Sequence, residues 1–255
     1  MNGDIYVVGG FVRNEQNNEN QVVRDCFKID KQMVVSKLEK MLTARFGSPL
    51  AWVHERFILA LGGFMKTGDQ TQDCECFDAY TNHWFRIAAL PFPVANTTAI
   101  VMNNSKVYLM PGKQTRQSQN PPFLMICVLD CGDPATFRGD PLSREYGYAI
   151  TDKSWSYLEV VNADFIKSFP VAAIQLNEQE MMIFGGETTK TFIFNTVKDV
   201  ASNSQRATVV TSSGVLDRKA KFGYRTDYVC KTFGPIFYAI DSVDQIIHTH
   251  EVTSL

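Results

Sequence analysis

The strongest candidate for metal chemistry is the pair His248 and His250, whose rings would lie on one face of a β-strand with Glu251 adjacent. Zinc and copper sites need three or four ligands, and Tyr224 or Tyr228 would have to supply one of them. Ordinary polar residues on an outer strand are the favoured interpretation of this pair. We therefore expect no metal site and no cofactor.

Signatures of catalysis are mostly absent from the sequence. His54-Glu55 is followed by no second histidine at the spacing of a zinc protease. There is no Gly-x-Ser-x-Gly motif, no phosphate-binding glycine loop and no calcium loop. The sequence therefore favours a protein that is not an enzyme.

Six cysteines are scattered along the chain, and no two form a Cys-x-x-Cys pair. Cys74 and Cys76 would share one face of a strand, but no second pair completes a tetrahedral zinc site. We therefore expect reduced thiols that act as small hydrophobic side chains in a cytoplasmic protein. The six are Cys26, Cys74, Cys76, Cys127, Cys131 and Cys230.

The charge of the chain is nearly balanced, with 25 basic and 27 acidic residues and a formal net charge of −2. Nothing therefore draws the whole molecule to nucleic acid or to an anionic membrane surface. No apolar run approaches the roughly 20 residues that a membrane-spanning helix needs, so we expect no membrane insertion. The basic cluster Arg218, Lys219, Lys221 and Arg225 is interpreted as a solvated loop rather than an anion site.

A six-residue apolar block recurs along the chain. Each copy is rich in β-branched and aromatic residues, which indicates a strand that is buried on both faces. Three copies end in a pair of glycines, which suits a strand end where the chain turns sharply or another backbone comes close. The copies are residues 5–10, 58–63, 107–112, 181–186 and 236–241, of which the last lacks both glycines.

More of the unit repeats around each block. A shorter apolar run and a polar turn precede it, as in residues 50–56, 99–105 and 171–179, and predict a hairpin. A third and a fourth strand follow, and four turn-separated strands repeating at about fifty residues are typical of a propeller blade. The fourth strands carry apolar residues at every third position: Val35, Leu38 and Met41; Trp84, Ile87 and Leu90; Trp155, Leu158 and Val161.

Residues 77–84, Phe-Asp-Ala-Tyr-Thr-Asn-His-Trp, resemble the kelch signature, in which a double glycine is followed by an aromatic residue, a turn and a tryptophan. Residues 148–155 repeat this spacing, and the resemblance covers essentially the whole chain. It implies an all-β fold, a kelch-type β-propeller of four-stranded blades with five recognisable repeats and five or six blades. Trp84 and Trp155 should then pack at equivalent positions against a neighbouring blade. The repeats span approximately residues 1–44, 45–93, 94–164, 165–217 and 218–255.

Two stretches fit the repeat less well. Residues 31–46 carry good helix formers on one apolar face, yet the repeat places a strand there, and we favour the strand. The third unit is longer than its neighbours and contains two candidates for its third strand, Phe123–Leu129 and Tyr146–Ile150. Tyr146–Ile150 is favoured, because it stands at the kelch spacing from Trp155.

The two ends of the chain are expected to lie in incomplete blades. The chain opens at a second strand, and the last unit ends at a third strand near residues 246–252. Propellers usually close by pairing strands from both termini, because an open ring leaves bare strand edges. We therefore expect the native polypeptide to extend beyond these residues.

Resemblance to kelch proteins implies a non-enzymatic interaction module that binds another protein or a multiprotein assembly, although a fold alone selects no partner. Two alternatives remain open: the substrate-recognition propeller of a ubiquitin ligase, and an enzyme acting on a sugar or small alcohol in the central channel. The expected binding surface is the insertion at residues 113–145, because insertions in repeat folds often form the binding face. This insertion could instead fold over the ring and cap its own blade. The candidate binding residues are Arg116, Phe137, Arg138 and Arg144.

Overall fold

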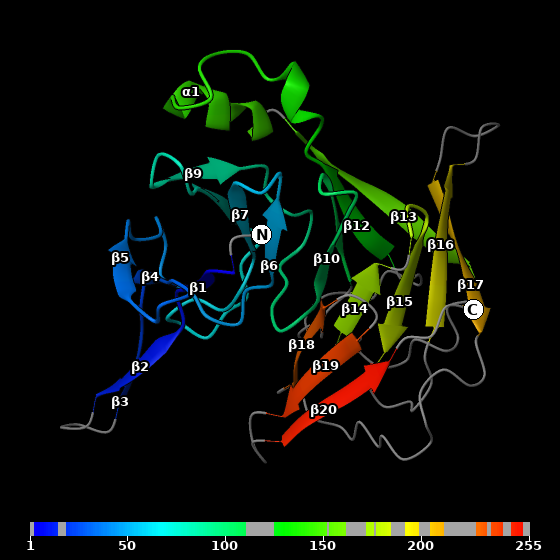
Figure 1. The fold of residues 1–255 in the computed structure, drawn as a ribbon, viewed down its shortest axis with the longest axis horizontal. Helices are drawn as coiled ribbons and strands as arrows, with labels where there is room; N and C mark the ends of the chain where they lie inside the picture. Colours follow the sequence, from blue (N-terminus) through cyan, green and yellow to red (C-terminus); the bar gives the residue numbers. More distant parts are fainter. Residues whose placement is uncertain are drawn as a thin grey trace. The chain divides into compact units, whose positions relative to one another are not determined.

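Strands make up nearly all the regular structure of the chain, so the expected all-β class is confirmed (Figure 1). Among the residues that the structure describes, helix is confined to one turn, α1 (Arg144–Gly147), and to the 3-10 turns η1 (Pro134–Thr136) and η2 (Tyr148–Ile150). This computed structural model describes residues 3–14, 19–110, 125–151, 153–161, 172–175, 177–184, 192–198, 205–211, 228–233, 236–241 and 246–251. The chain divides into two compact units, Met1–Asn96 with Asn103–Val107 and Leu129–Ser156, and Thr97–Met102 with Tyr108–Val128 and Tyr157–Leu255.

Two antiparallel sheets and a hairpin are built from residues 5–87 of the first unit. The first sheet has the strand order β1-β4-β5, and the second sheet has the order β6-β7-β8-β9. The hairpin β2-β3 lies between β1 and β4 in the chain. The strands are β1 (Ile5–Val8), β2 (Phe11–Asn14), β3 (Glu19–Val22), β4 (Cys26–Ile29), β5 (Val35–Leu38), β6 (Leu50–Val53), β7 (Phe57–Leu61), β8 (Cys74–Asp78) and β9 (His83–Ile87).

The later strands form two further sheets. One has eight strands in the order β10-β11-β12-β13-β17-β16-β15-β14, in which two four-stranded runs meet at the parallel pair β13 and β17. The other is β18-β19-β20, so β1 and β20 lie in different three-stranded sheets. The strands are β10 (Ala99–Met102), β11 (Lys106–Leu109), β12 (Met125–Asp130), β13 (Trp155–Val161), β14 (Ala172–Gln175), β15 (Glu180–Phe184), β16 (Phe192–Lys198), β17 (Gln205–Thr211), β18 (Tyr228–Phe233), β19 (Ile236–Asp241) and β20 (Ile246–Glu251).

The first two repeats share their backbone hydrogen bonds as well as their sequence pattern. The glycine pair follows β1 in the first repeat and β7 in the second, with φ of +60° at its first residue and +106° to +107° at its second residue. Gly185 and Gly186, the third copy, lie outside the described residues. In the first repeat, the N–H groups of Gly9, Gly10 and Met41 donate to the carbonyls of Asp25 (3.0 Å), Arg45 (2.9 Å) and Arg24 (3.0 Å). The equivalent bonds of the second repeat run from Gly62 to Asp73 (3.1 Å), from Gly63 to Val94 (2.7 Å) and from Leu90 to Gln72 (2.8 Å).

The two tryptophans of the kelch-like spacing occupy equivalent positions, as expected. The indole N–H of Trp84 donates to Glu39 O at 3.0 Å, and that of Trp155 donates to Ala88 O at 3.0 Å. Each acceptor is the residue directly after the fourth strand of the preceding repeat, β5 or β9. Trp84 is 1% exposed, whereas Trp155 is partly buried. The tryptophan therefore joins the second repeat to the first and the third repeat to the second.

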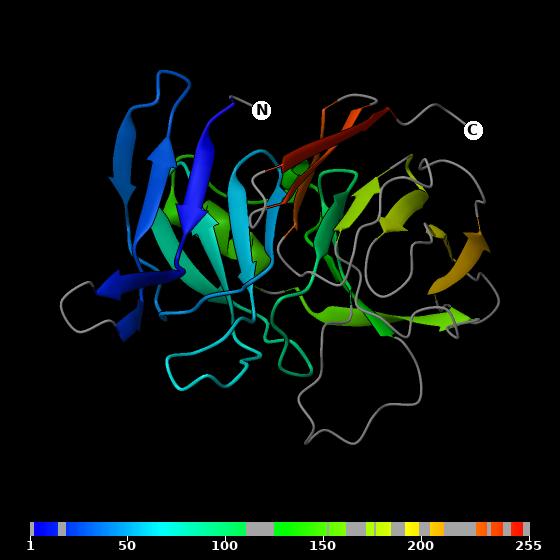
Figure 2. The ribbon, with the colours of Figure 1, turned by 90° about the horizontal axis from the view of Figure 1, so that it is seen from below.

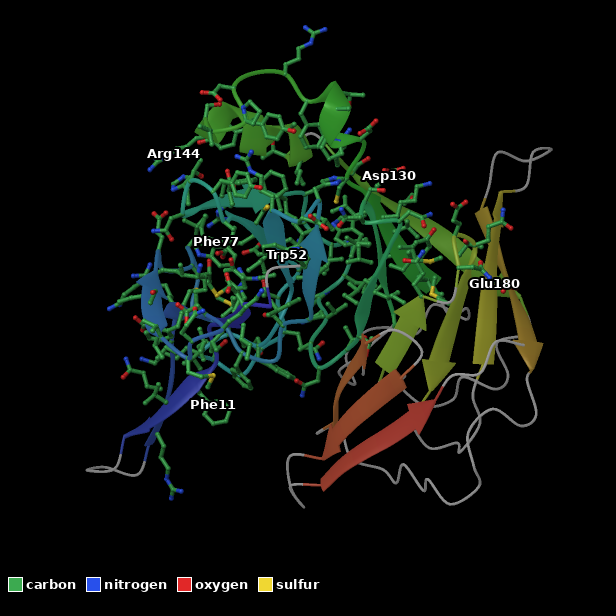
Figure 3. All side chains as sticks on the ribbon, in the orientation of Figure 1. Phe11, Trp52, Phe77, Asp130, Arg144 and Glu180 are labelled. Carbon is green, nitrogen blue, oxygen red and sulfur yellow. The ribbon has the colours of Figure 1, made fainter. Side chains whose placement is uncertain are left out.

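One hydrophobic cluster of the first unit lies between its first and second sheets. Ile58, Ala60, Phe77 and Trp84 on the second sheet form a buried cluster with Cys26 and Met41. The facing side of the first sheet contributes partly buried hydrophobic residues, including Tyr6, whose ring centroid lies 5.3 Å from that of Trp52. Figure 3 labels Trp52 and Phe77 in this interior. No helix among the described residues is long and apolar enough to cross a membrane.

Both stretches that fitted the repeat poorly are now assigned. Residues 35–38 form β5, which confirms the strand that the repeat predicted within residues 31–46. The prediction of a third strand at Tyr146–Ile150 is wrong, because α1 and η2 occupy this stretch and β12 is the third strand. The hydroxyl of Ser143 accepts the Tyr146 N–H at 3.3 Å, a helix-capping contact. The apolar run at β12 is instead buried on both sides of its sheet: Ile126, Cys127, Val128 and Leu129 are each at most 2% exposed.

Replacing Gly62 with alanine should destabilise the fold more than replacing Gly10. Both glycines have positive φ, so alanine carries a backbone cost of about 1–2 kcal/mol at either position. At Gly62 a Cβ would also lie 2.5 Å from Val94 O, whereas at Gly10 it would meet nothing within 4 Å. Urea unfolding should show a loss that is larger for G62A than for G10A by about 1 kcal/mol or more. Equal losses would contradict the close approach of the two backbones.

Candidate functional site

The connection between β12 and β13, residues 131–154, carries three of the four candidate binding residues: Phe137, Arg138 and Arg144. Arg116 lies outside the described residues. We call residues 131–154 the capping loop, because it covers the turn between β6 and β7. In the second repeat the corresponding connection, between β8 and β9, is only the short turn at residues 79–82. Figure 3 labels Arg144 at the start of α1, within this loop.

Arg56 is the buried cation beneath the capping loop. It ends the turn that joins β6 to β7, and its side chain is 5% exposed. Its Nε donates to Asp78 Oδ1 at 2.7 Å, and its Nη2 donates to Asp78 Oδ2 at 2.6 Å. Asp78 is the last residue of β8, so this two-point contact joins the two turns at one end of the second sheet.

The same guanidinium holds the capping loop. Nη1 of Arg56 donates to the carbonyl of Pro141, and Nη2 lies 3.5 Å from the carbonyl of Ser143. The Arg56 Cζ also lies 4.6 Å from the ring centroid of Tyr146 and 4.8 Å from that of Tyr80. Charge-assisted hydrogen bonds and cation–π contacts therefore join the loop to the second sheet.

Asp78 is held in its ionised form. Burial alone would raise the pKa of Asp78, but hydrogen bonds from Arg56, from the Tyr80 N–H and from the Thr81 hydroxyl outweigh it, so the pKa lies below the usual value. The Arg56–Asp78 pair is therefore charged and well supplied with hydrogen bonds. Such a pair suits a structural anchor better than a site for an incoming anion.

His54 lies beside this pair, in a left-handed backbone conformation with φ of +54°. Its ring packs edge-on against Phe57 and Phe137, with centroids 6.4 and 5.7 Å apart. Burial lowers the pKa of His54, opposed by a hydrogen bond with the backbone of Cys131 and by nearby carboxylates. Phe137 also contacts Tyr146, with centroids 5.3 Å apart, so this candidate binding residue helps to anchor the loop.

The remaining candidate residues are exposed. Arg138 and Arg144 have no hydrogen bond or ion pair among the described residues, and Leu142 between them is 74% exposed. Two described carboxylates of the loop, by contrast, are used locally: Asp133 accepts the Ala135 N–H and Asp140 accepts the Leu142 N–H, both at 2.9 Å. Among the described residues, the loop therefore presents two exposed guanidinium groups without a partner and an exposed leucine.

Arg56 and Asp78, which hold the loop, were not among the residues singled out from the sequence. A buried ion pair between two turns follows no periodic pattern. The only signal was a charged residue at the border of each of two strands that are buried throughout, β7 and β8. This pattern is unusual, because Arg and Asp are seldom fully buried without a partner.

No metal site is evident in the part of the chain that the structure describes, where no three His, Cys, Asp or Glu side chains gather. The metal candidates His248 and His250 lie on β20, opposite Ala239 and Phe237 of β19. Tyr224 and the basic cluster at residues 218–225 lie outside the described residues. The thiols of Cys26, Cys74, Cys76, Cys127 and Cys131 are free, and burial raises the pKa of Cys74 to about 11 and that of Cys131 to about 12. These thiols are poor nucleophiles at neutral pH.

Comparison of the chain with models of protein families and with curated proteins finds no match.

Removing the charge of Arg56 should loosen the capping loop and weaken the fold. Arg56→Met leaves the carboxylate of Asp78 buried without its cation, and such losses amount to about 3–5 kcal/mol. Trypsin should then cleave faster after Arg138 and Arg144. Replacing the exposed Arg86 with Met serves as the control and should change neither stability nor cleavage.

The double variant Arg56→Met, Asp78→Leu distinguishes the loss of the loop anchor from a general loss of fold stability. With no buried charge left, it should recover part of the lost stability and none of the loop protection. Unchanged trypsin cleavage in Arg56→Met would show that Arg56 does not hold the loop.

His54 should make stability depend on pH near neutrality. Because its pKa is lower in the folded state, the unfolded chain takes up the proton first as the pH falls. The contribution of His54 to the free energy of unfolding is therefore fully present above about pH 6.5 and decreases as the pH falls below that value. In His54→Asn this decline should be smaller, and the turn should be kept, because Asn103 has the same conformation (φ +52°) at the equivalent position. Urea unfolding at about pH 7.5 and 5.5 tests this; equal pH dependence in both proteins would contradict it.

Proposed function

We propose that the chain is a kelch-type β-propeller domain that acts as a non-enzymatic protein-interaction module. The capping loop is its binding surface, and its partner is another protein or a multiprotein assembly rather than nucleic acid. The proposal includes a cytoplasmic location, which agrees with the free thiols of the described cysteines.

Two observations support the kelch-type propeller. The backbone bonds of the glycine pairs recur in the first two repeats, and the tryptophan bond to the preceding repeat recurs in the second and third. Such repetition means that each repeat contacts its predecessor in the same way. A regular step from one sheet to the next is the geometric requirement for a ring of blades.

The interaction role rests on the way in which the capping loop is held. Arg56, paired with Asp78, donates to the carbonyl of Pro141 directly beside the exposed Leu142. A loop that is already held in place, here by the Arg56 side chain, loses less conformational entropy when it binds a partner. Arg56 contacts the loop at Pro141 and Tyr146, whereas Arg138, Leu142 and Arg144 are exposed to solvent. This arrangement suits recognition better than structural capping alone.

Reversing the two free charges of the loop should abolish partner capture without affecting the fold. In the double variant Arg138→Glu, Arg144→Glu, proteins that co-purify with the wild-type chain from cell extract should fall by about tenfold or more. Thermal unfolding should stay unchanged, since both side chains are exposed.

The matched control is Lys31→Glu, Lys66→Glu, two exposed lysines outside the capping loop. It changes the net charge equally and should leave the captured proteins unchanged. An equal loss in both double variants would point to the overall charge, and no loss in either would place the binding surface elsewhere.

A further inference from the structure

His54 forms the contact between the turn that joins β6 to β7 and the first half of the capping loop. Its ring packs edge-on against Phe57 of β7 and against Phe137 of the loop. The N–H of His54 donates to the carbonyl of Asn104 at 2.9 Å, so the turn itself is held in place. In both views the short helices of the loop, in green, lie beside the strands of the second sheet, in shades of cyan (Figure 1, Figure 2). The ring therefore lies between a fixed turn and the loop.

The two ring nitrogens of His54 have different surroundings. A hydrogen bond joins the ring to the backbone of Cys131, the first residue of the loop. Nε2 is buried and has no hydrogen-bond partner among the residues that the structure describes. A neutral imidazole tolerates this arrangement, because one nitrogen carries the proton and the other is only an acceptor. Protonation turns Nε2 into a charged donor, and no described group is in place to accept its hydrogen.

Two carboxylates near His54 partly oppose this cost. Asp130, at the end of β12, and Asp133, in the loop, both favour the protonated ring. Each also has another partner. Asp130 lies 3.5 Å from the ammonium group of Lys106, and Asp133 accepts the Ala135 N–H at 2.9 Å. Their support for a charged ring is therefore shared with other groups.

The other charged groups near His54 do not favour a protonated ring. Arg56, on the same turn, is itself a cation, and Glu55 is exposed. Lys153 is a second cation near the thiol of Cys131. Burial outweighs the two carboxylates, so the pKa of His54 lies below its ordinary value. The closed loop therefore holds His54 neutral, whereas an open loop, in which water reaches Nε2, would restore an ordinary titration.

Two glycines bracket the part of the loop that touches His54. Gly132 has φ of +77° and Gly139 has φ of +102°, which is the region that glycine adopts most easily. Between them lie η1, which contains no buried residue, and then Phe137 and Arg138. We call residues 132–139 the hinged segment.

The rest of the loop is held separately. Arg56 donates to the carbonyl of Pro141, outside the hinged segment. Tyr146 joins the two parts, because its hydroxyl donates to the carbonyl of Pro134 at 3.0 Å and its ring contacts Phe137. These contacts keep the hinged segment closed while His54 is neutral. A segment that is closed by a few such contacts can open locally while the sheet beneath it stays folded.

We infer that His54 is a pH-sensitive latch: protonation of its ring opens the hinged segment and leaves the part of the loop that Arg56 holds in place. The inference rests on the proposed function, since the opening separates Arg138 from Arg144 and so divides the proposed binding surface. Acidification then releases the partner. The proton binds the open loop better than the closed loop, and this difference shifts the equilibrium between them. Because an accessible histidine titrates near pH 6.5, the opening takes place below about that pH.

Limited digestion with trypsin, followed by mass spectrometry, tests the latch without any partner. Arg138 lies inside the hinged segment and Arg144 outside it, so the ratio of the initial cleavage rates after these two residues cancels the pH dependence of trypsin itself. In the full wild-type chain this ratio should rise about fivefold between about pH 7.5 and pH 5.5. In His54→Asn the ratio should be the same at both pH values, whatever its level.

The matched control is His83→Asn, since His83 lies on β9 and its Nδ1 is 2.9 Å from the carboxylate of Glu39. This variant should respond to pH as the wild type does. A wild-type ratio that does not change with pH overturns the inference, and general unfolding would have that result because it accelerates both cleavages. An equal rise in His54→Asn overturns it as well, because another group would then be responsible.

Capture from cell extract at the same two pH values tests the consequence for binding. The proteins that co-purify with the wild-type chain should fall by about half or more at the lower pH, and those that co-purify with His54→Asn should not change. An equal fall in both proteins overturns the link between the latch and binding. If the charge reversal at Arg138 and Arg144 leaves capture unchanged while the cleavage ratio still responds to pH, the proposed function fails and the latch stands.

Discussion

A sheet whose strands are apolar on both sides must be packed on both sides, and this constraint shapes the first unit. β7 and β8 are buried along their whole length, so the second sheet needs the first sheet against one of its faces. The glycine pairs let the backbones of successive repeats approach closely, and the indole of Trp84 binds the preceding repeat by its N–H.

Buried charge joins the parts that apolar packing does not specify. Arg45, which follows the first repeat, donates to the carbonyls of Gly62 and Asp73 and to the carboxylate of Glu75 in the second. At the other end of the second sheet, Arg56 donates to the carboxylate of Asp78 and to the carbonyl of Pro141 in the capping loop. Each guanidinium ties a connection to a rigid sheet through directional bonds, which apolar contacts cannot provide. The capping loop is positioned by such bonds, and its remaining charges are left for recognition.

The proposed binding surface depends on the buried ion pair between Arg56 and Asp78. The capping loop is polar and anchored, with the exposed Arg138, Leu142 and Arg144 above a saturated ion pair. Charged, loop-borne surfaces suit selective and reversible partners.

The sequence by itself determined the β class, the repeat register and the equivalence of Trp84 with Trp155, because two-sided apolar strands, glycine pairs and turns are local patterns. It favoured Tyr146–Ile150 over the true third strand β12, since the serine cap of a short helix was a weaker signal than the kelch spacing. Only the tertiary structure decided that Arg56 and Asp78 meet and that Phe137 packs against His54. These features depend on which segments distant in the chain come together. Burial and ion pairing are set by those neighbours, and no local pattern records them.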